Sequence, residues 1–147
     1  MPSTSSPTRT RRSRRTLVGK VRNNIIGPAG VTGSGSTVGF PIRVQNEGRV
    51  PVTMAITDNT INESVGFTGI NVITTTAGTG ATNVTITGNS VNNIDSGHGV
   101  LVQQIDHTTA GLNAGTVCAA IYGRTVLASN RDPVITGIVL DFDDYAF

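Results

Sequence analysis

Four segments of the chain repeat one short pattern, an alternating hydrophobic strand that runs into a turn. The two clearest copies occupy residues 54–61 (MAITDNTI) and 84–91 (VTITGNSV), and weaker copies occupy residues 19–26 and 119–126. The equivalent turn positions are 35, 30 and 35 residues apart and hold Asn24, Asn59, Asn89 and Arg124. Self-similarity with a period of about 20–50 residues is typical of stacked-repeat proteins. The repeats therefore predict four similar units stacked on one another.

Each repeat is expected to contribute two or three short strands. Val84 and Ile86 alternate with Thr85 and Thr87, which places apolar and polar side chains on opposite faces of a strand. A second strand follows the turn in each repeat, at residues 41–44, 69–72, 99–102 and 137–140. Stacked repeats with parallel pairing bury their inward side chains together. The predicted inward column consists of Ile56, Ile86, Ile121, Ile70, Val100 and Ile138.

The Asn residues of the turns are expected to have a structural role. Asn24, Asn59 and Asn89 would lie above one another at equivalent corners of the stack. Their amides can then hydrogen-bond along the stack and satisfy backbone groups of the corners. Arg124 takes the fourth corner, so we expect the ladder to end and the stack to loosen there.

Composition supports an all-β chain. Aromatic residues make up 4% of the sequence and Trp is absent, while small and β-branched residues dominate, as a narrow regular stack requires. No long stretch has the 3.6-residue apolar spacing of a helix. No run approaches the roughly 20 apolar residues that span a bilayer. The chain has one cysteine, so it can form no internal disulfide.

Charge divides the chain into two parts. Residues 1–22 hold seven basic residues and no acid, whereas residues 23–147 hold four Arg and nine acids. Residues 1–16 are rich in Ser, Thr, Pro and Arg, which predicts a disordered basic tail. Residues 17–147 form the predicted repeat domain. Because residues 140–147 still alternate like a strand and no polar cap follows, we expect this domain to be a fragment of a longer solenoid.

The repeat phrases carry a family resemblance. Residues 86–91 (ITGNSV) and 69–72 (GINV) resemble the right-handed parallel β-helix repeats of pectate-lyase-like proteins. They are closer still to Gly/Thr/Asn-rich repetitive surface or secreted proteins of bacteria, and the resemblance covers residues 17–142. It implies a right-handed parallel β-helix (solenoid) of about four coils and a secreted or cell-surface parent protein. The chain shows no signal peptide, since only Leu17 and Val18 follow the Arg pairs as an apolar segment.

Enzymatic chemistry has little support in the sequence. The outward positions of the second strands are Arg43, Asn71, Leu101 and Val139, so the carboxylate surface that binds Ca²⁺ in polysaccharide lyases has no match. The clustered Asp141, Asp143 and Asp144 are best explained as solvated residues. The potential soft metal ligands, His98, His107 and Cys118, lack metal-binding spacing. Cys118 is expected to point outward. We therefore expect no lyase or hydrolase activity, no metal and no cofactor.

Two functions remain open. The first is a non-catalytic structural or adhesive module, with polysaccharide as a candidate ligand of its Thr/Asn-rich rungs. Its partners would be neighbouring coils of a longer chain or further copies of itself. The alternative is a coat-like or nucleic-acid-binding protein that uses the basic tail, since Arg clusters bind phosphates without reading sequence. The tail residues concerned are Arg9, Arg11, Arg12, Arg14 and Arg15.

Overall fold

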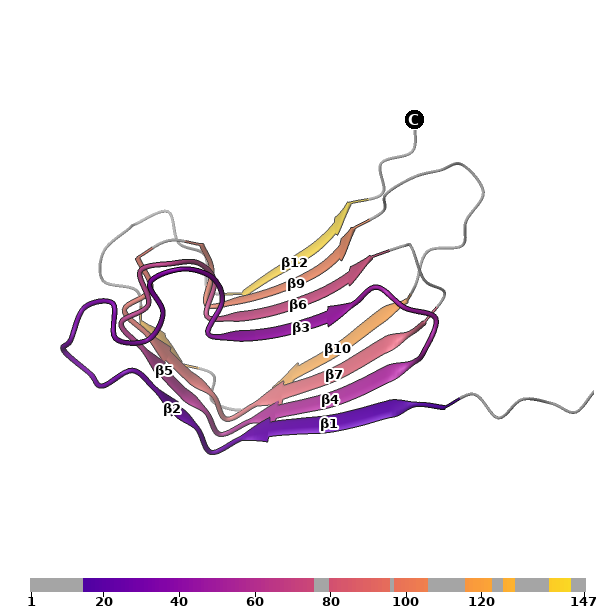
Figure 1. Cartoon of the computed structure of the whole chain (residues 1–147), viewed down its shortest axis with the longest axis horizontal. Helices are drawn as coiled ribbons and strands as arrows, with labels where there is room; N and C mark the ends of the chain where they lie inside the picture. Colours follow the sequence, from indigo (N-terminus) through magenta and orange to yellow (C-terminus); the bar gives the residue numbers. More distant parts are fainter. Residues whose placement is uncertain are drawn as a thin grey trace, which may run out of the picture.

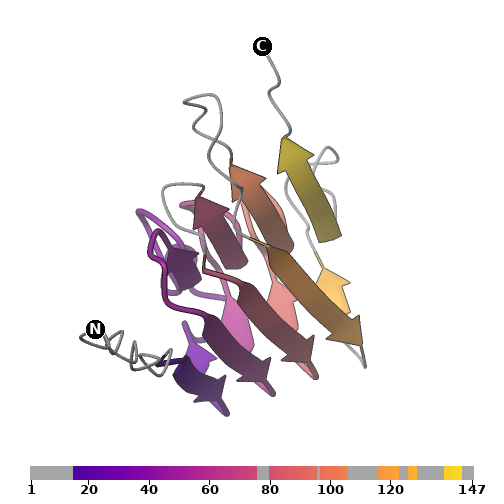
Figure 2. The ribbon, with the colours of Figure 1, turned by 90° about the vertical axis from the view of Figure 1, so that its right-hand side faces the viewer.

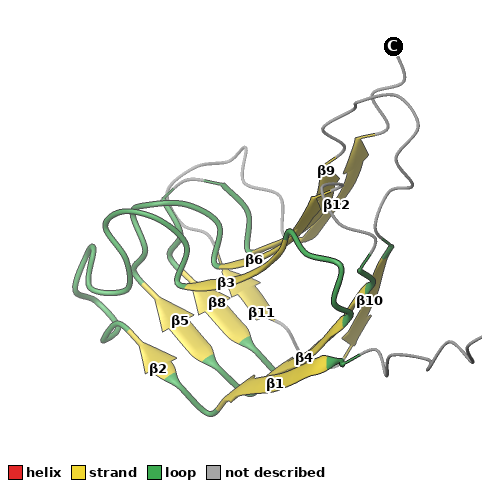
Figure 3. Ribbon diagram, turned by 45° about the vertical axis from the view of Figure 1, so that its right-hand side comes forward, coloured by secondary structure: helices red, strands yellow, loops and turns green. Residues whose placement is uncertain are grey.

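A computed structural model describes residues 15–75, 80–95, 97–105, 116–122, 126–128 and 138–143. These residues contain strands, turns and loops but no helix (Figure 3). The strands are β1 (Leu17–Arg22), β2 (Ile25–Ile26), β3 (Ile42–Asn46), β4 (Val52–Thr57), β5 (Thr60–Asn62), β6 (Ile70–Thr75), β7 (Thr82–Thr87), β8 (Ser90–Asn92), β9 (Val100–Ile105), β10 (Val117–Tyr122), β11 (Val126–Ala128) and β12 (Ile138–Asp143).

The strands form three parallel sheets. Their orders are β1-β4-β7-β10, β2-β5-β8-β11 and β3-β6-β9-β12, so every third strand along the chain joins the same sheet (Figures 1 and 2). Each of the described strand pairs is parallel. The prediction of an all-β chain with parallel pairing between successive repeats is therefore confirmed. The arrangement is compatible with a parallel β-helix.

The spacing of the sequence repeats equals the spacing of paired strands. Val21 of β1 pairs with Ile56 of β4, Ile56 pairs with Ile86 of β7, and Ile86 pairs with Ile121 of β10. These steps are the 35, 30 and 35 residues that separate the turn positions. Ile56 and Ile86 are fully buried, while Val21 and Ile121 are half-buried against the same core. One inward column thus runs through the first sheet.

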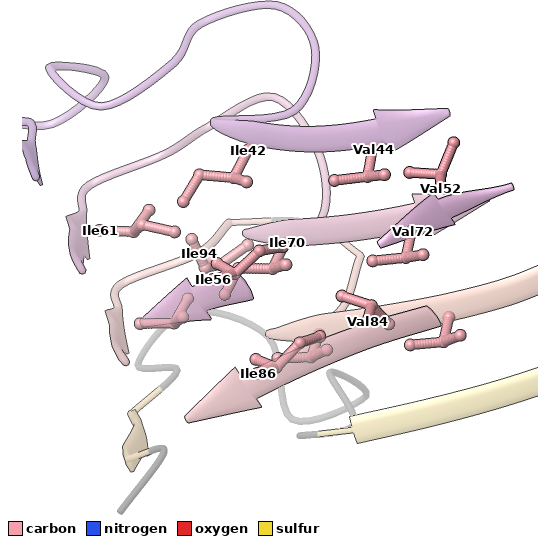
Figure 4. Packing of buried hydrophobic residues seen from close by; sticks show 13 residues of the cluster. Ile42, Val44, Val52, Ile56, Ile61, Ile70, Val72, Val84, Ile86 and Ile94 are labelled. Carbon is pink, nitrogen blue, oxygen red and sulfur yellow. The ribbon is translucent and has the colours of Figure 1, made fainter. Parts of the chain in front are cut away.

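The other two sheets complete the core. Ile61 and Val91 are register partners in the second sheet, and Ile70 and Val100 are register partners in the third. All four side chains are at least 99% buried, and they belong to one cluster with Ile56 and Ile86 (Figure 4). Fully burying one such side chain contributes about 1.5–3 kcal/mol. Ile138, on β12, takes the register position next to Val100.

A left-handed residue makes the corner between the first and second sheets. Asn23, Asp58 and Gly88 have φ values of 56°, 55° and 66°, and each directly precedes an Asn of the repeat. Asn, Asp and Gly are the residues that enter this region at the lowest cost. The recurring Asn-Asn, Asp-Asn and Gly-Asn pairs therefore encode the corner itself.

The outward position held by Asn71 is buried. Its side chain is 1% exposed, although Arg43, its register partner on β3, is exposed as expected. Asn71 is the shortest side chain in a row with Arg43 and Leu101, so longer neighbours flank its amide on both sides. Its Nδ2 donates a hydrogen bond of 3.4 Å to Gln103 Oε1. Packing between adjacent strands has closed a position that alternation alone assigns to solvent.

Candidate binding surface

The structure brings Asn24, Asn59 and Asn89 together in a hydrogen-bonded ladder. The backbone N–H and Nδ2 of Asn24 donate to Asn59 Oδ1 at 3.1 and 2.9 Å. The same two groups of Asn59 donate to Asn89 Oδ1 at 3.0 and 2.9 Å. The ladder therefore has a direction, with donors on one rung and the acceptor on the next.

The buried amides of Asn59 and Asn89 also donate to backbone carbonyls, and Asn89 does so twice, because its Nδ2 also donates to Thr87 O at 3.2 Å. Asn59 Nδ2 donates to Val21 O at 3.0 Å, and Asn89 Nδ2 donates to Ile56 O at 2.8 Å. Asn59 and Asn89 are 1% and 0% exposed, whereas Asn24 is exposed. Buried amides with every bond made hold a corner in place. They are structural residues and offer no free group for binding or catalysis.

A second Asn pair was missed by the sequence reasoning. Asn92 Nδ2 donates to Asn62 Oδ1 at 2.9 Å, and Asn62 Nδ2 donates to Gly27 O at 2.9 Å. Asn62 and Asn92 are register partners at the ends of β5 and β8. They are 30 residues apart, as Asn59 and Asn89 are, so the repeat spacing contained the signal. The corner after the second sheet is therefore also joined by an Asn side-chain bond, with the opposite direction of donation.

Glu63 is a buried acid that the sequence did not single out. It is 3% exposed and has a φ of 53°, an uncommon conformation for Glu. Its Oε1 accepts bonds from the Gly30 N–H at 3.0 Å and from Asn93 Nδ2 at 2.6 Å. The carboxylate thereby ties the loop after β2 to the chain after β8. These contacts give Glu63 an architectural role.

The outward face of β4 and β7 carries uncharged polar side chains. Thr53 pairs with Asn83, Ala55 with Thr85, and Thr57 with Thr87. Thr53 and Asn83 are exposed, and the other three polar side chains are half-exposed. We name Thr53, Thr57, Asn83, Thr85 and Thr87 the Thr/Asn face. It is a regular array of hydroxyl and amide groups without a formal charge.

An aromatic pair, one ring of which is exposed, lies in the loops that lead into the third sheet. The rings of Phe40 and Phe67 are 5.5 Å apart at an angle of 32°, and the Arg43 guanidinium lies 5.1 Å from the centre of the Phe40 ring. Phe67 is 52% exposed. This pair was not predicted from the sequence, because residues 40 and 67 lie outside the alternating segments.

The remaining predicted residues do not assemble into a catalytic site. Cys118 is exposed, as its phase on β10 indicates, and His98 lies in the turn before β9. Within the part of the chain that the structure describes, no three His, Cys, Asp or Glu residues are grouped to hold a metal ion. His107, Arg124 and Asp144 lie outside the described residues, and Asp141 and Asp143 are placed only by their register on β12.

The predicted nucleic-acid tail is described only at its end. Arg15 is exposed and lies two residues before Leu17, the first residue of β1, while Arg9, Arg11, Arg12 and Arg14 lie outside the described residues. A search of the described residues for a helix long and apolar enough to cross a membrane finds none.

Comparisons of the chain with protein-family models, with curated proteins and with solved structures return no match.

Proposed function

We propose that the chain folds as a right-handed parallel β-helix that serves as a non-catalytic structural and adhesive module of a bacterial surface or secreted protein. The architecture supports the proposal because each repeat adds one strand to each of three parallel sheets. Successive corners are joined by hydrogen bonds between the side chains of stacked Asn residues. Such a stack is a rigid scaffold whose outward side chains are available for contact.

The Thr/Asn face is the observation that carries the adhesive part of the proposal. Neighbouring strands are about 4.8 Å apart, and alternate residues along a strand are about 6.6 Å apart. Thr53, Asn83 and Thr85 therefore present donors and acceptors at regular intervals on one face of the sheet. Neutral polysaccharides also repeat hydroxyl groups along an extended chain. Many weak hydrogen bonds on one chain then add to a useful avidity.

The aromatic pair supplies a second kind of contact. The faces of Phe rings carry negative partial charge, which favours packing against the C–H groups of a sugar ring. Phe67 is exposed enough to accept such a ring, and Arg43 offers hydrogen-bond donors beside the neighbouring Phe40. This surface resembles the aromatic lining of small-molecule sites, where a few polar groups fix orientation.

Binding of the full chain to immobilised neutral polysaccharides tests the proposal. The substitution Thr53→Ala/Asn83→Ala/Thr85→Ala removes the central groups of the Thr/Asn face and should lower retention at least tenfold. Gln45→Ala, an exposed polar position on β3, is the control and should bind as the unchanged chain does. Circular dichroism verifies that both variants fold. Absence of binding to every polysaccharide offered, or equal loss in the control, would refute the adhesive role.

A further inference from the structure

The two ends of the stack expose edges that match one another. Among the described strands, β1, β2 and β3 pair on one side only, and so do β10, β11 and β12. An unpaired strand edge presents N–H and C=O groups that can pair with another chain. We name the coil that contains β1, β2 and β3 the first end, and the coil that contains β10, β11 and β12 the last end.

The first end also exposes the head of the hydrophobic core. An open hollow of about 390 Å³ lies between β1, β2 and β3, and its apolar lining includes the half-buried Val21 and Ile26 together with Ile42, which is buried. These residues are register partners of the buried Ile56, Ile61 and Ile70. A further rung of the same repeat would cover them as each inner rung covers the one before it.

The Asn ladder ends on a free acceptor at the first end. Asn59 Oδ1 and Asn89 Oδ1 each accept two bonds from the preceding rung. Asn24 Oδ1 accepts none from any described residue, and the side chain is exposed. Asn59 Oδ1 and Asn89 Oδ1 accept from the rung before them, so a rung stacked on the first end would bring donors to the equivalent Asn24 Oδ1.

One outward register position of the first sheet is polar in the inner rungs and less polar at the two ends. At this position the inner rungs hold the polar Thr53 and Asn83, while the ends hold Val18, which is 68% exposed, and Cys118, which is exposed. If another rung packed against Val18, its apolar side chain would be removed from water, which is favourable.

The second sheet shows the same change. Its inner rungs hold Thr60 and Ser90, while the first end holds Ile25, which is 79% exposed, and the last end holds Val126 at the same register position. Stacking of one end on the other places Ile25 next to Val126. It also places the exposed Arg22 next to Tyr122, which is 60% exposed and suited to a cation–π contact.

We propose that a second copy of this chain stacks its last end on the first end, head to tail, in the register that joins the inner rungs. The contact continues all three sheets and places Val18 of one copy beside Cys118 of the next. Because the two surfaces differ, each copy keeps one free end, and the product is an open filament. The inference rests on the stacked architecture in the proposed function and is independent of saccharide binding.

A disulfide test reads the register directly. Paired residues on adjacent strands lie about 4.8 Å apart, within the Cα–Cα range of about 4.4–6.8 Å that a disulfide spans. Mild oxidation of Val18→Cys should therefore give a reducible series of covalent oligomers through Cys118. Thr53→Cys is the matched control, because it lies at the same register position one rung inward. It should form no species beyond a dimer. Equal products from both variants would overturn the proposed register.

Sedimentation velocity tests the assembly itself. The unchanged chain should form species that grow with protein concentration, and Val18→Lys should need at least a tenfold higher concentration for the same growth. Thr53→Lys, an exposed inner position, should assemble as the unchanged chain does. A chain that stays monomeric, or that stops at a closed dimer, would refute the proposal. Polysaccharide retention by Val18→Lys shows separately whether the Thr/Asn face functions, so the two proposals fail independently.

Discussion

Asn59 donates two hydrogen bonds to Asn89 Oδ1, one from its backbone N–H at 3.0 Å and one from its Nδ2 at 2.9 Å. The two residues are 30 positions apart in the chain and adjacent in the fold. Each Asn also completes a corner, because it directly follows a residue in the left-handed conformation, Asp58 before Asn59 and Gly88 before Asn89. The turn and the bond between turns are thus encoded by one dipeptide.

Replacement of Asn59 by Ala should destabilise the fold by about 2–4 kcal/mol. The change removes the bonds to Asn24, Asn89 and Val21 and leaves buried groups unsatisfied, each at a cost of about 1–3 kcal/mol. Asn24→Ala, at the exposed end of the ladder, should cost less than about 1 kcal/mol. Urea denaturation of both variants provides the comparison. A similar loss for both would show that the ladder does not control stability.

The cost of replacing an isoleucine by alanine should increase with the burial of its side chain. Ile86→Ala should lower the free energy of unfolding by about 2–5 kcal/mol, because Ile86 is fully buried and leaves a cavity. Ile121→Ala should cost less, since Ile121 is half-buried at the last end. Ile25→Ala, at a position 79% exposed, is the control and should change the unfolding of dilute protein little. Thermal or urea unfolding at one low concentration ranks the three.

Gly88 tests the left-handed corner. Gly88→Asn should be tolerated, because Asn23 takes the same conformation at the equivalent corner. Gly88→Val should cost about 1–3 kcal/mol, because a β-branched side chain is strained at a φ of 66°. Both variants add a Cβ that meets the Asp58 carboxylate, so that contact is shared and the difference isolates backbone strain. Equal melting temperatures would contradict this explanation of the corner.

The basic tail remains the alternative function and has its own test. Replacement of Arg9, Arg11, Arg12, Arg14 and Arg15 by Ser in the full chain removes the charge without altering the repeats. If the tail binds nucleic acid, the unchanged chain binds duplex DNA with an affinity that falls steeply with salt, by a slope of about 0.9 per phosphate contact. The variant should lose that binding and that slope. Equal, negligible binding by both proteins eliminates the alternative.

The strand pattern and the pairing of repeats could be predicted from the sequence because both depend on local, periodic features. The alternation of apolar and polar residues predicted that Val84 and Ile86 point inward. The distances between turn positions predicted which residues of neighbouring strands pair. The same reasoning identified Cys118 as outward. Such features repeat at fixed intervals, so each copy supports the interpretation of the others.

The missed features depend on contacts between elements. Asn71 is buried because longer side chains flank it from adjacent strands. Glu63 is satisfied by Gly30 and Asn93, which lie in loops of different repeats. Phe40 meets Phe67 across two loops of unequal length. The alternation of residues within one strand does not predict contacts between different strands or loops.

The unequal connections between β2 and β3 and between β5 and β6 have a consequence for variation. The first comprises residues 27–41 and the second residues 63–69, yet the strands they join remain in register. Peptide can therefore be inserted at this side of the molecule without displacing the sheets. The sheets and these connections can therefore diverge separately in sequence and in length.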